Sequence, residues 1–338
     1  MSSPSQTLGL KTLRHFVSNN DGWHLSLHQS WDELRLVKGR RPVLIVPGYG
    51  MNSYIFSFHS SGPSLESYLA HAGFEVWRVD LRAQGSSVSV GGGENYRMED
   101  LALTDLGAAI DAALLYSKTG ADRADILGAS LGGTLMFVQA VLNENHRMGS
   151  LVAMGAPLRW EKVNPFVRAL FAWPMLAGAV RIKGTRRLAE IALPHLVKRA
   201  PWLLSLYLNP SITDTAAARQ MVKTVEDPNR HINRQLAHWI KDKDLILKGV
   251  NISQSIGKVT APFLCVLANA DGIVPKQTAE FSYKKIGSKI KKLIRVGDKE
   301  TKVAHADLFI SSESHEKVFA PLSEWLIEHN GALKPAAE

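Results

Sequence analysis

The chain of 338 residues contains a single cysteine, Cys265. One thiol excludes an intramolecular disulfide and a metal cluster built from cysteines, so we expect no metal site of that kind. Cys265 lies in the apolar run of residues 262–268, and a buried thiol in a strand is the simplest interpretation of that position.

Long apolar runs are also missing. No stretch approaches the roughly 18 uncharged apolar residues that a membrane-spanning helix needs. The first ten residues have neither the basic start nor the apolar core of a secretion signal. These features predict a cytoplasmic protein, with peripheral membrane association left open.

The positive charge is unevenly distributed. The formal net charge is +9, and residues 159–250 alone hold 16 Lys and Arg against 7 Asp and Glu. The rest of the chain has 24 residues of each sign. Such a block attracts anionic substrates or an anionic membrane surface, although a solvated helical surface gives the same count. We expect no nucleic-acid partner. The block also contains four of the eight tryptophans, Trp160, Trp173, Trp202 and Trp239.

Strand-like and helix-like segments alternate on both sides of this block. Residues 13–36 predict a hairpin that turns at the Asn-Asn-Asp-Gly sequence of residues 19–22. Alternation of buried strands with helices predicts a mostly parallel central sheet flanked by helices. The expected strands are residues 42–47, 74–79, 124–127, 151–154, 262–268 and 292–296, and the expected helices are residues 64–72, 98–116, 131–142, 275–286 and 318–329.

The alternation stops after Pro157 and returns at Pro262. Residues 158 to about 250 contain no convincing strand, and prolines divide them into several helix-like stretches. We therefore expect an inserted helical cap at residues 158–250, between a first core part at residues 1–157 and a second at residues 251–338.

One short sequence dominates the functional interpretation. Gly128-Ala129-Ser130-Leu131-Gly132 follows an apolar strand and precedes an apolar helix, and it matches the G-x-S-x-G pattern of a nucleophile elbow. In that turn a strained serine projects its hydroxyl above the sheet. Side chains at Gly128 and Gly132 would collide with neighbouring backbone.

Together these features resemble the α/β-hydrolase superfamily over roughly residues 40–158 and 255–330. The family places an acid and then a histidine after the serine in the chain. The resemblance implies that Ser130 is the nucleophile, Asp271 the acid and His305 the base, with no cofactor required. Asp298 and Asp307 are competing acids close to His305 in sequence, and either could orient its loop.

The resemblance also implies an oxyanion hole made by two backbone amides. Leu131 supplies one because it follows the nucleophile. Tyr49 supplies the other, from the loop Pro47-Gly48-Tyr49-Gly50 after the strand at residues 42–47. Many relatives have a histidine where this chain has Pro47, so the loop departs from the family pattern.

Residues 72–87 are similar to the corresponding segment of acid lipases and of polyhydroxyalkanoate synthases and their hydrolase relatives. The synthases use a cysteine nucleophile, so Ser130 favours hydrolysis over chain growth. A serine in place of the aspartate of dehalogenases and epoxide hydrolases points to ester, thioester or lipid acyl bonds.

We therefore expect a serine hydrolase that cleaves carboxylic esters with hydrophobic acyl groups through an acyl-enzyme on Ser130. The substrate is a small-molecule or lipid-like ester, and the basic cap is a candidate for contact with an anionic membrane. An acyltransferase or thioesterase with the same triad, and a non-catalytic binding protein on this scaffold, remain alternatives. The cap residues named for the substrate pocket, which could instead be cap core, are Phe171, Trp173, Met175 and Tyr207.

Overall fold

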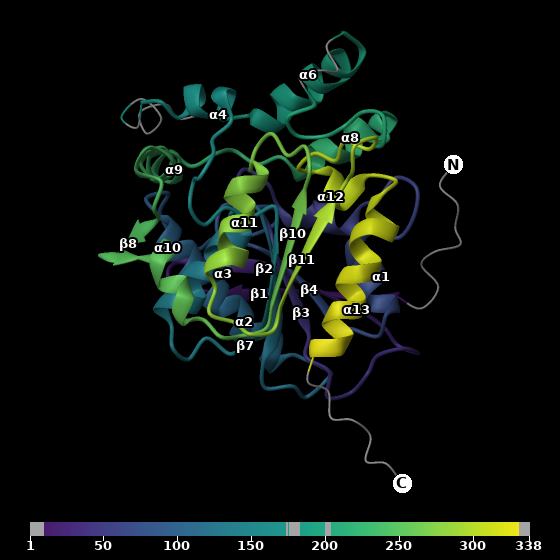
Figure 1. Ribbon diagram of the computed structural model, residues 1–338. Coiled ribbons are helices and arrows are strands. Elements are labelled where there is room, and N and C mark those ends of the chain that lie inside the picture. Colours follow the sequence, from purple (N-terminus) through teal and green to yellow (C-terminus); the bar gives the residue numbers. More distant parts are fainter. Residues whose placement is uncertain (1–9, 174, 176–182, 200–203, 331–338) are drawn as a thin grey trace.

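The computed structural model describes residues 10–173, 175, 183–199 and 204–330. A nine-stranded sheet lies at the centre (Figure 1). The strands from one edge to the other are β1 (Leu10–Ser18), β2 (Trp23–Asp32), β4 (Val76–Asp80), β3 (Val43–Val46), β6 (Ala124–Ala129), β7 (Met148–Met154), β10 (Phe263–Ala268) and β11 (Lys291–Val296), with β5 (Val88–Ser89) beside β2.

The sheet is parallel from β4 to β11 and antiparallel at its amino-terminal edge. The predicted hairpin is confirmed as β1 and β2, joined by a turn in which Asn20 and Gly22 have φ of 58° and 74°. Asn19 stabilises this turn because its side-chain oxygen accepts hydrogen bonds from the backbone of Asp21 and Trp23. The expected mostly parallel sheet is therefore confirmed.

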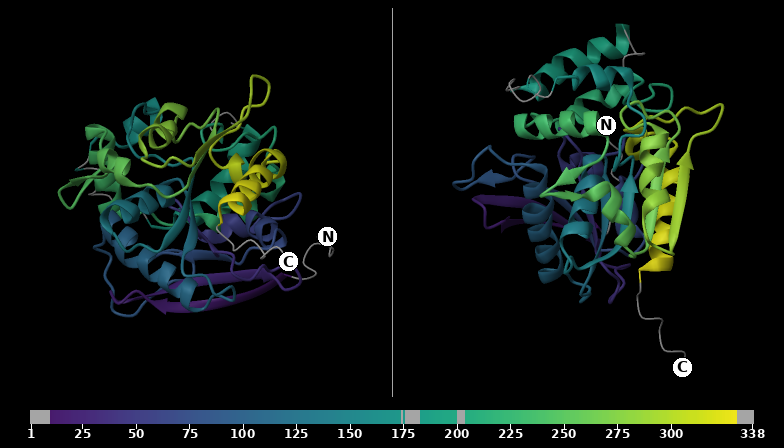
Figure 2. Two further views of the ribbon diagram at one scale, coloured as in Figure 1. Left: turned by 60° about the horizontal axis from the view of Figure 1, so that its bottom comes forward. Right: turned by 60° about the vertical axis from the view of Figure 1, so that its left-hand side comes forward.

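Helices cover both faces of the sheet (Figures 1 and 2). On one face lie α2 (Leu106–Leu115), α3 (Leu131–Leu142) and α11 (Lys276–Lys285), and on the other α1 (Leu65–His71) and α13 (Ala320–His329). Strand β3 shows why an apolar run suits this position. Its Leu44 and Val46 belong to the core under α2 and α3, and its Val43 and Ile45 belong to the core under α1 and α13. The predicted burial of Cys265, in β10, is also confirmed.

Two helices begin with a wider turn than the sequence suggested. The expected helix at residues 98–116 consists of a π-helical segment, η3 (Asp100–Asp105), followed by α2. This segment ends at Asp105, whose buried carboxylate accepts hydrogen bonds from Asn19 and Arg82. A second π-helical segment, η7 (His315–Phe319), precedes α13 in the same way. Apolar spacing cannot distinguish these turns from α-helix.

Between β7 and β10 the chain forms helices above the carboxyl ends of the parallel strands (Figure 1). The expectation of no strand before residue 250 is wrong in one detail, because β8 (Ile246–Leu247) and β9 (Val250–Asn251) form a small hairpin, too short to show a periodic pattern. The division into core, cap and core stays a prediction. The described helices between β7 and β8 are α4 (Pro165–Leu170), α6 (Thr185–Arg199), η4 (Thr215–Ala217), α8 (Ala218–Met221), η5 (Val222–Thr224) and α9 (Arg230–Asp242).

Short helices complete the fold at the ends of the strands. The remaining described elements are η2 (Ser53–Ser57) after β3, α10 (Ile252–Ser255) and η6 (Ile256–Lys258) before β10, and α12 (Asp307–Ile310) after β11.

None of the helices in the described part of the chain has both the length and the apolar character needed to cross a bilayer.

Candidate active site

Ser130 occupies the single residue between β6 and α3, in a strained conformation. Its φ and ψ are 52° and −122°, a backbone conformation that residues other than glycine rarely adopt. Such a conformation costs roughly 1–3 kcal/mol and persists only where the surroundings enforce it. Here the Ser130 amide donates a hydrogen bond of 2.9 Å to the carbonyl of Met154, at the end of β7.

Three glycines permit the turn because the backbone passes too closely for side chains. A Cβ atom on Gly128 would lie 2.4 Å from the Cα atom of Gly133, and one on Gly132 would lie 2.3 Å from the carbonyl oxygen of Val46. Gly133 has the same requirement, since its Cβ would lie 2.4 Å from that of Ala156. The five-residue pattern did not include Gly133.

Asp271 and His305 form a buried hydrogen-bonded pair. The distance between His305 Nδ1 and Asp271 Oδ2 is 2.6 Å. Asp271 follows β10, and its other oxygen accepts hydrogen bonds of 2.9 and 2.8 Å from the amides of Ile273 and Val274. When Nδ1 donates its proton to Asp271, Nε2 is left as an acceptor, which is the state that a general base requires.

The two competing carboxylates have other partners. Asp298 is exposed and accepts hydrogen bonds from the amides that follow it in its turn. Asp307 is buried and accepts hydrogen bonds from the Ala304 amide, at 2.7 Å, and from the Thr213 hydroxyl. Burial raises the pKa of Asp307. Asp307 therefore contacts the backbone of the His305 loop, and Asp271 contacts the imidazole itself.

Residues 154–155 link the turn of Ser130 to this pair. A Cβ atom on Gly155 would lie 3.1 Å from His305 Cε1 and 3.3 Å from Asp271 Oδ2, and the preceding residue, Met154, accepts the Ser130 amide. The structure gives no direct hydrogen bond between Ser130 and His305, both of which are described. Such bonds often tighten only when substrate is bound.

The loop after β3 passes directly beside Ser130. A Cβ atom on Gly48 would lie 2.9 Å from that of Ser130, so the loop approaches this closely only with glycine. Tyr49 and Leu131, the two predicted amide donors, both line one small cavity of about 30 Å³. The Tyr49 hydroxyl donates a hydrogen bond to Asn233 of α9, and burial raises the pKa of Tyr49. Their role as oxyanion donors stays a prediction.

A larger apolar cavity of about 280 Å³ shares Tyr49 and Gly50 with the small one as lining residues. Tyr207 lines it, with its ring centroid 6.0 Å from that of His305. Burial, together with the nearby carboxylates of Asp271 and Asp307, raises the pKa of Tyr207 to about 12. The other lining residues are Gly50, Met51, Ile55, Phe58, Leu193, Leu204, Leu208, Met221, Val222, Thr224, Val225 and Ile310.

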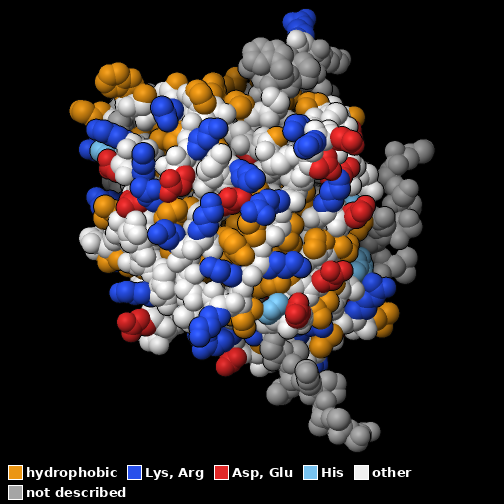
Figure 3. Space-filling view, viewed as in Figure 1, with side chains coloured by type: hydrophobic (Ala, Val, Ile, Leu, Met, Phe, Trp, Pro, Cys, Tyr) orange, Lys and Arg blue, Asp and Glu red, His pale blue; other side chains and the backbone are white. Residues whose placement is uncertain are grey.

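The other three residues named for a substrate pocket lie outside this cavity. Phe171 is half-buried against the core, and Trp173 and Met175 are 70% and 81% exposed. Hydrophobic side chains lie along the upper edge of the molecule, over α4 (Figure 3). The sequence identified these residues as apolar but not which way they face, and it missed Leu193 and Met221 because the cavity combines segments far apart in the chain.

Backbone hydrogen bonds join residues 206–207 to the loops that carry Asp271 and His305. The Gly272 amide donates to the carbonyl of Leu206 at 3.1 Å, and the Ala306 amide donates to the carbonyl of Tyr207 at 2.7 Å. Residues 206–207 are therefore part of the structure that holds Asp271 and His305 together. Among the described residues, no group of three or more His, Cys, Asp or Glu side chains is placed to hold a metal ion.

Comparison with known proteins supports the same architecture. The model of the alpha/beta hydrolase fold matches residues 41–300. An esterase from Thermogutta terrifontis has 18% identity and a TM-score of 0.62, covering 95% of this chain and 99% of that one. A meta-cleavage product hydrolase from Pseudomonas fluorescens has 16% identity and a TM-score of 0.62, covering 95% and 99%. A monoacylglycerol lipase from Paleococcus ferrophilus has 16% identity and a TM-score of 0.60, covering 90% and 99%. The chain therefore belongs to the α/β-hydrolase fold family.

Proposed function

We propose that this protein is a serine hydrolase of carboxylic esters with apolar acyl groups. The observation that carries the proposal is the strained Ser130 beside the hydrogen-bonded pair of Asp271 and His305. A serine in such a turn is exposed to substrate, and it becomes a useful nucleophile when a base accepts its proton. The esterase and the lipase among the similar structures agree with this chemistry, although the fold alone does not determine it.

In the proposed reaction, Ser130 Oγ attacks the ester carbonyl carbon while His305 Nε2 takes its proton. The amides of Tyr49 and Leu131 stabilise the negative oxygen of the tetrahedral intermediate. The intermediate collapses to an acyl-enzyme when His305 returns the proton to the departing alcohol. Water then attacks the acyl-enzyme by the same steps and regenerates Ser130. Asp271 holds the imidazole in position and stabilises its charged form.

The apolar cavity supports the choice of acyl group. Two of its lining residues connect it to the proposed site: Tyr49 belongs to the oxyanion loop, and the ring of Tyr207 lies near that of His305. The other walls are mostly aliphatic and aromatic. An acyl chain that binds there is transferred out of water, and the transfer free energy is favourable by about 0.8 kcal/mol for each buried methylene group. We infer that turnover improves as the acyl chain lengthens until the cavity is full.

The test compares Ser130→Ala and His305→Ala with the wild type on p-nitrophenyl esters of increasing chain length. Each variant is expected to lose hydrolysis while keeping its circular dichroism spectrum, and a fluorophosphonate probe should label the wild type at Ser130. His238→Ala is the matched control, because His238 is exposed on α9 and belongs to no part of the proposed mechanism. Undiminished turnover in Ser130→Ala would contradict the proposal. Transfer of the acyl group to added alcohols or thiols in preference to water would favour the acyltransferase alternative.

A further inference from the structure

The oxyanion loop is paired with a segment of the cap. Met51 and Val225 form an antiparallel bridge. On either side of the bridge, the Asn52 amide donates to the carbonyl of Thr224 at 2.9 Å, and the Glu226 amide donates to the carbonyl of Gly50 at 2.8 Å. The backbone that follows Tyr49 is therefore shaped by residues 224–226 of the cap as well as by β3.

The Glu226 side chain lies where three segments meet. One of its carboxylate oxygens accepts hydrogen bonds from Asn52 Nδ2 at 2.6 Å, from the Gly85 amide at 3.0 Å and from Arg186 Nη2 at 2.7 Å. These donors belong to the oxyanion loop, to the loop after β4 and to cap helix α6. The side chain is only 17% exposed, so water replaces these contacts poorly when they are lost.

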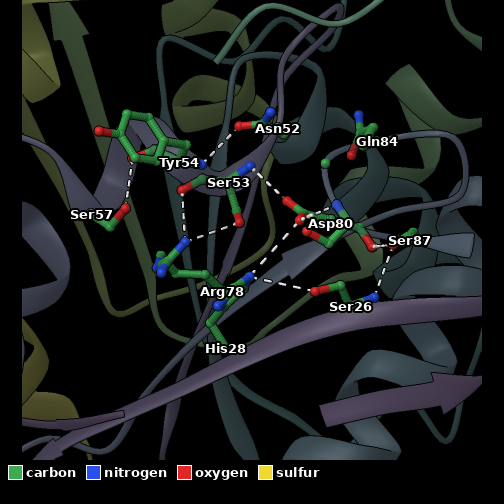
Figure 4. A network of polar contacts seen from close by, with 12 residues as sticks. Ser26, His28, Asn52, Ser53, Tyr54, Ser57, Arg78, Asp80, Gln84 and Ser87 are labelled. Atoms are coloured by element: carbon green, nitrogen blue, oxygen red, sulfur yellow. Dashed lines mark hydrogen bonds and ion pairs between the residues drawn. The ribbon is translucent and has the colours of Figure 1, made fainter. Parts of the chain in front are cut away.

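The far end of the loop is fixed from the sheet. Asp80 at the end of β4 accepts a hydrogen bond from the Ser53 amide at 2.9 Å, and Arg78 donates to the Ser53 carbonyl (Figure 4). Asp80 also accepts the Ser86 amide, beside Gly85. The sheet thus holds both loops from below, and Glu226 joins the same two loops to each other and to the cap.

We propose that Glu226 is a positioning residue for the oxyanion hole. Glu226 fixes the loop that carries Tyr49, whose amide must point at the developing negative charge. Through Arg186 it also couples the position of α6 to that loop. Gly48 already rests against Ser130, so Gly50 and Asn52 are the anchors that set the direction of the intervening peptide. This inference rests on the proposed function, because it assigns a role in the same reaction.

The inference predicts a change in kcat with little change in KM. An oxyanion donor contributes mainly in the transition state, so a displaced donor weakens transition-state binding and leaves substrate binding almost intact. Complete loss of one donor costs roughly 100- to 1,000-fold in kcat, and a loosened loop should cost part of that, roughly 10- to 100-fold.

The experiment measures kcat and KM of Glu226→Ala and Glu226→Gln for hydrolysis of a p-nitrophenyl ester. Glu226→Ala should show the loss in kcat, and Glu226→Gln should recover most of it because the amide oxygen still accepts hydrogen bonds from Asn52 and Gly85. Inhibition by a trifluoromethyl ketone should weaken in parallel with kcat/KM, since the bound inhibitor carries the same negative oxygen as the intermediate.

Asp227→Ala is the matched control for a loosened cap. The neighbouring carboxylate of Asp227 accepts hydrogen bonds from Gly184 and Thr185 at the start of α6 and from no part of the oxyanion loop. This variant should lower thermal stability and leave kcat near the wild-type value. Equal losses of kcat in Asp227→Ala and Glu226→Ala, or a change confined to KM, would overturn the positioning role.

The activity of the wild type distinguishes failure of the positioning role from failure of the proposed ester hydrolysis. An active wild type with an unimpaired Glu226→Ala variant overturns the positioning role alone. A wild type that hydrolyses no ester overturns both.

Discussion

The strain at Ser130 predicts that the proposed nucleophile lowers the stability of the protein. Replacing Ser130 by alanine removes the hydroxyl but keeps the Cβ atom that makes φ of 52° unfavourable. Replacing it by glycine removes the strain as well. Relief of the strain should stabilise the fold by roughly 1–3 kcal/mol. The greater freedom of an unfolded glycine opposes this by about 0.5–1 kcal/mol. Ser130→Gly should therefore be more stable than Ser130→Ala by about 1 kcal/mol at the middle of these ranges, and by at most roughly 2.5 kcal/mol.

Thermal and urea unfolding of the two inactive variants measure this difference. In a chain of this length, an unfolding entropy of about 2.1 cal/mol/K per residue converts each kcal/mol into a shift of roughly 1–2 °C in Tm. Two other alanine-to-glycine changes act as controls. Ala83→Gly, at φ of 59°, should stabilise, whereas Ala121→Gly, at a residue without positive φ, should destabilise. If Ser130→Gly unfolds at or below the temperature of Ser130→Ala, the strain argument is refuted.

Two more predictions concern the cap. Gly272→Ala should lower both kcat and Tm, because the new Cβ atom would lie 2.6 Å from the Cα atom of Leu206. Overpacking of this kind costs about 1–3 kcal/mol of stability. Wild-type kinetics in this variant would contradict the close contact. The wild type should co-sediment at low salt with phosphatidylglycerol vesicles and not with phosphatidylcholine vesicles, because Trp173 and Ile191 are 70% and 68% exposed on the basic cap. Replacing both by serine should weaken binding, and absence of wild-type binding would exclude this surface.

The parts of the structure that the sequence predicted well depend on local patterns. The strands and the turn around Ser130 are encoded within a few neighbouring residues, since apolar runs form buried strands and glycines permit close backbone contacts. The pairing of Asp271 with His305 joins residues 34 positions apart, and it was anticipated because the family resemblance supplied the order of the motifs.

The parts that the sequence did not predict depend on distant segments. Apolar residues such as Trp173 and Leu193 have the same character in sequence, yet Leu193 lines the cavity and Trp173 faces solvent. The contact between Asn52 and Glu226 joins residues 174 positions apart, and nothing in either local sequence indicates it. The π-helical turn at η3 also escaped, because one additional residue in a turn hardly alters apolar spacing.

The hydrogen bonds from Gly272 and Ala306 to Leu206 and Tyr207 have a consequence for protein engineering. Caps on hydrolase scaffolds invite exchange as modules to change specificity. In this protein, an exchange that removed residues 206–207 would also remove the carbonyls to which the loops of Asp271 and His305 are bonded. A chimaera should keep that segment, residues 224–226 and Arg186, which contacts Glu226, and graft new sequence only into α4 and the part of α6 that follows Arg186.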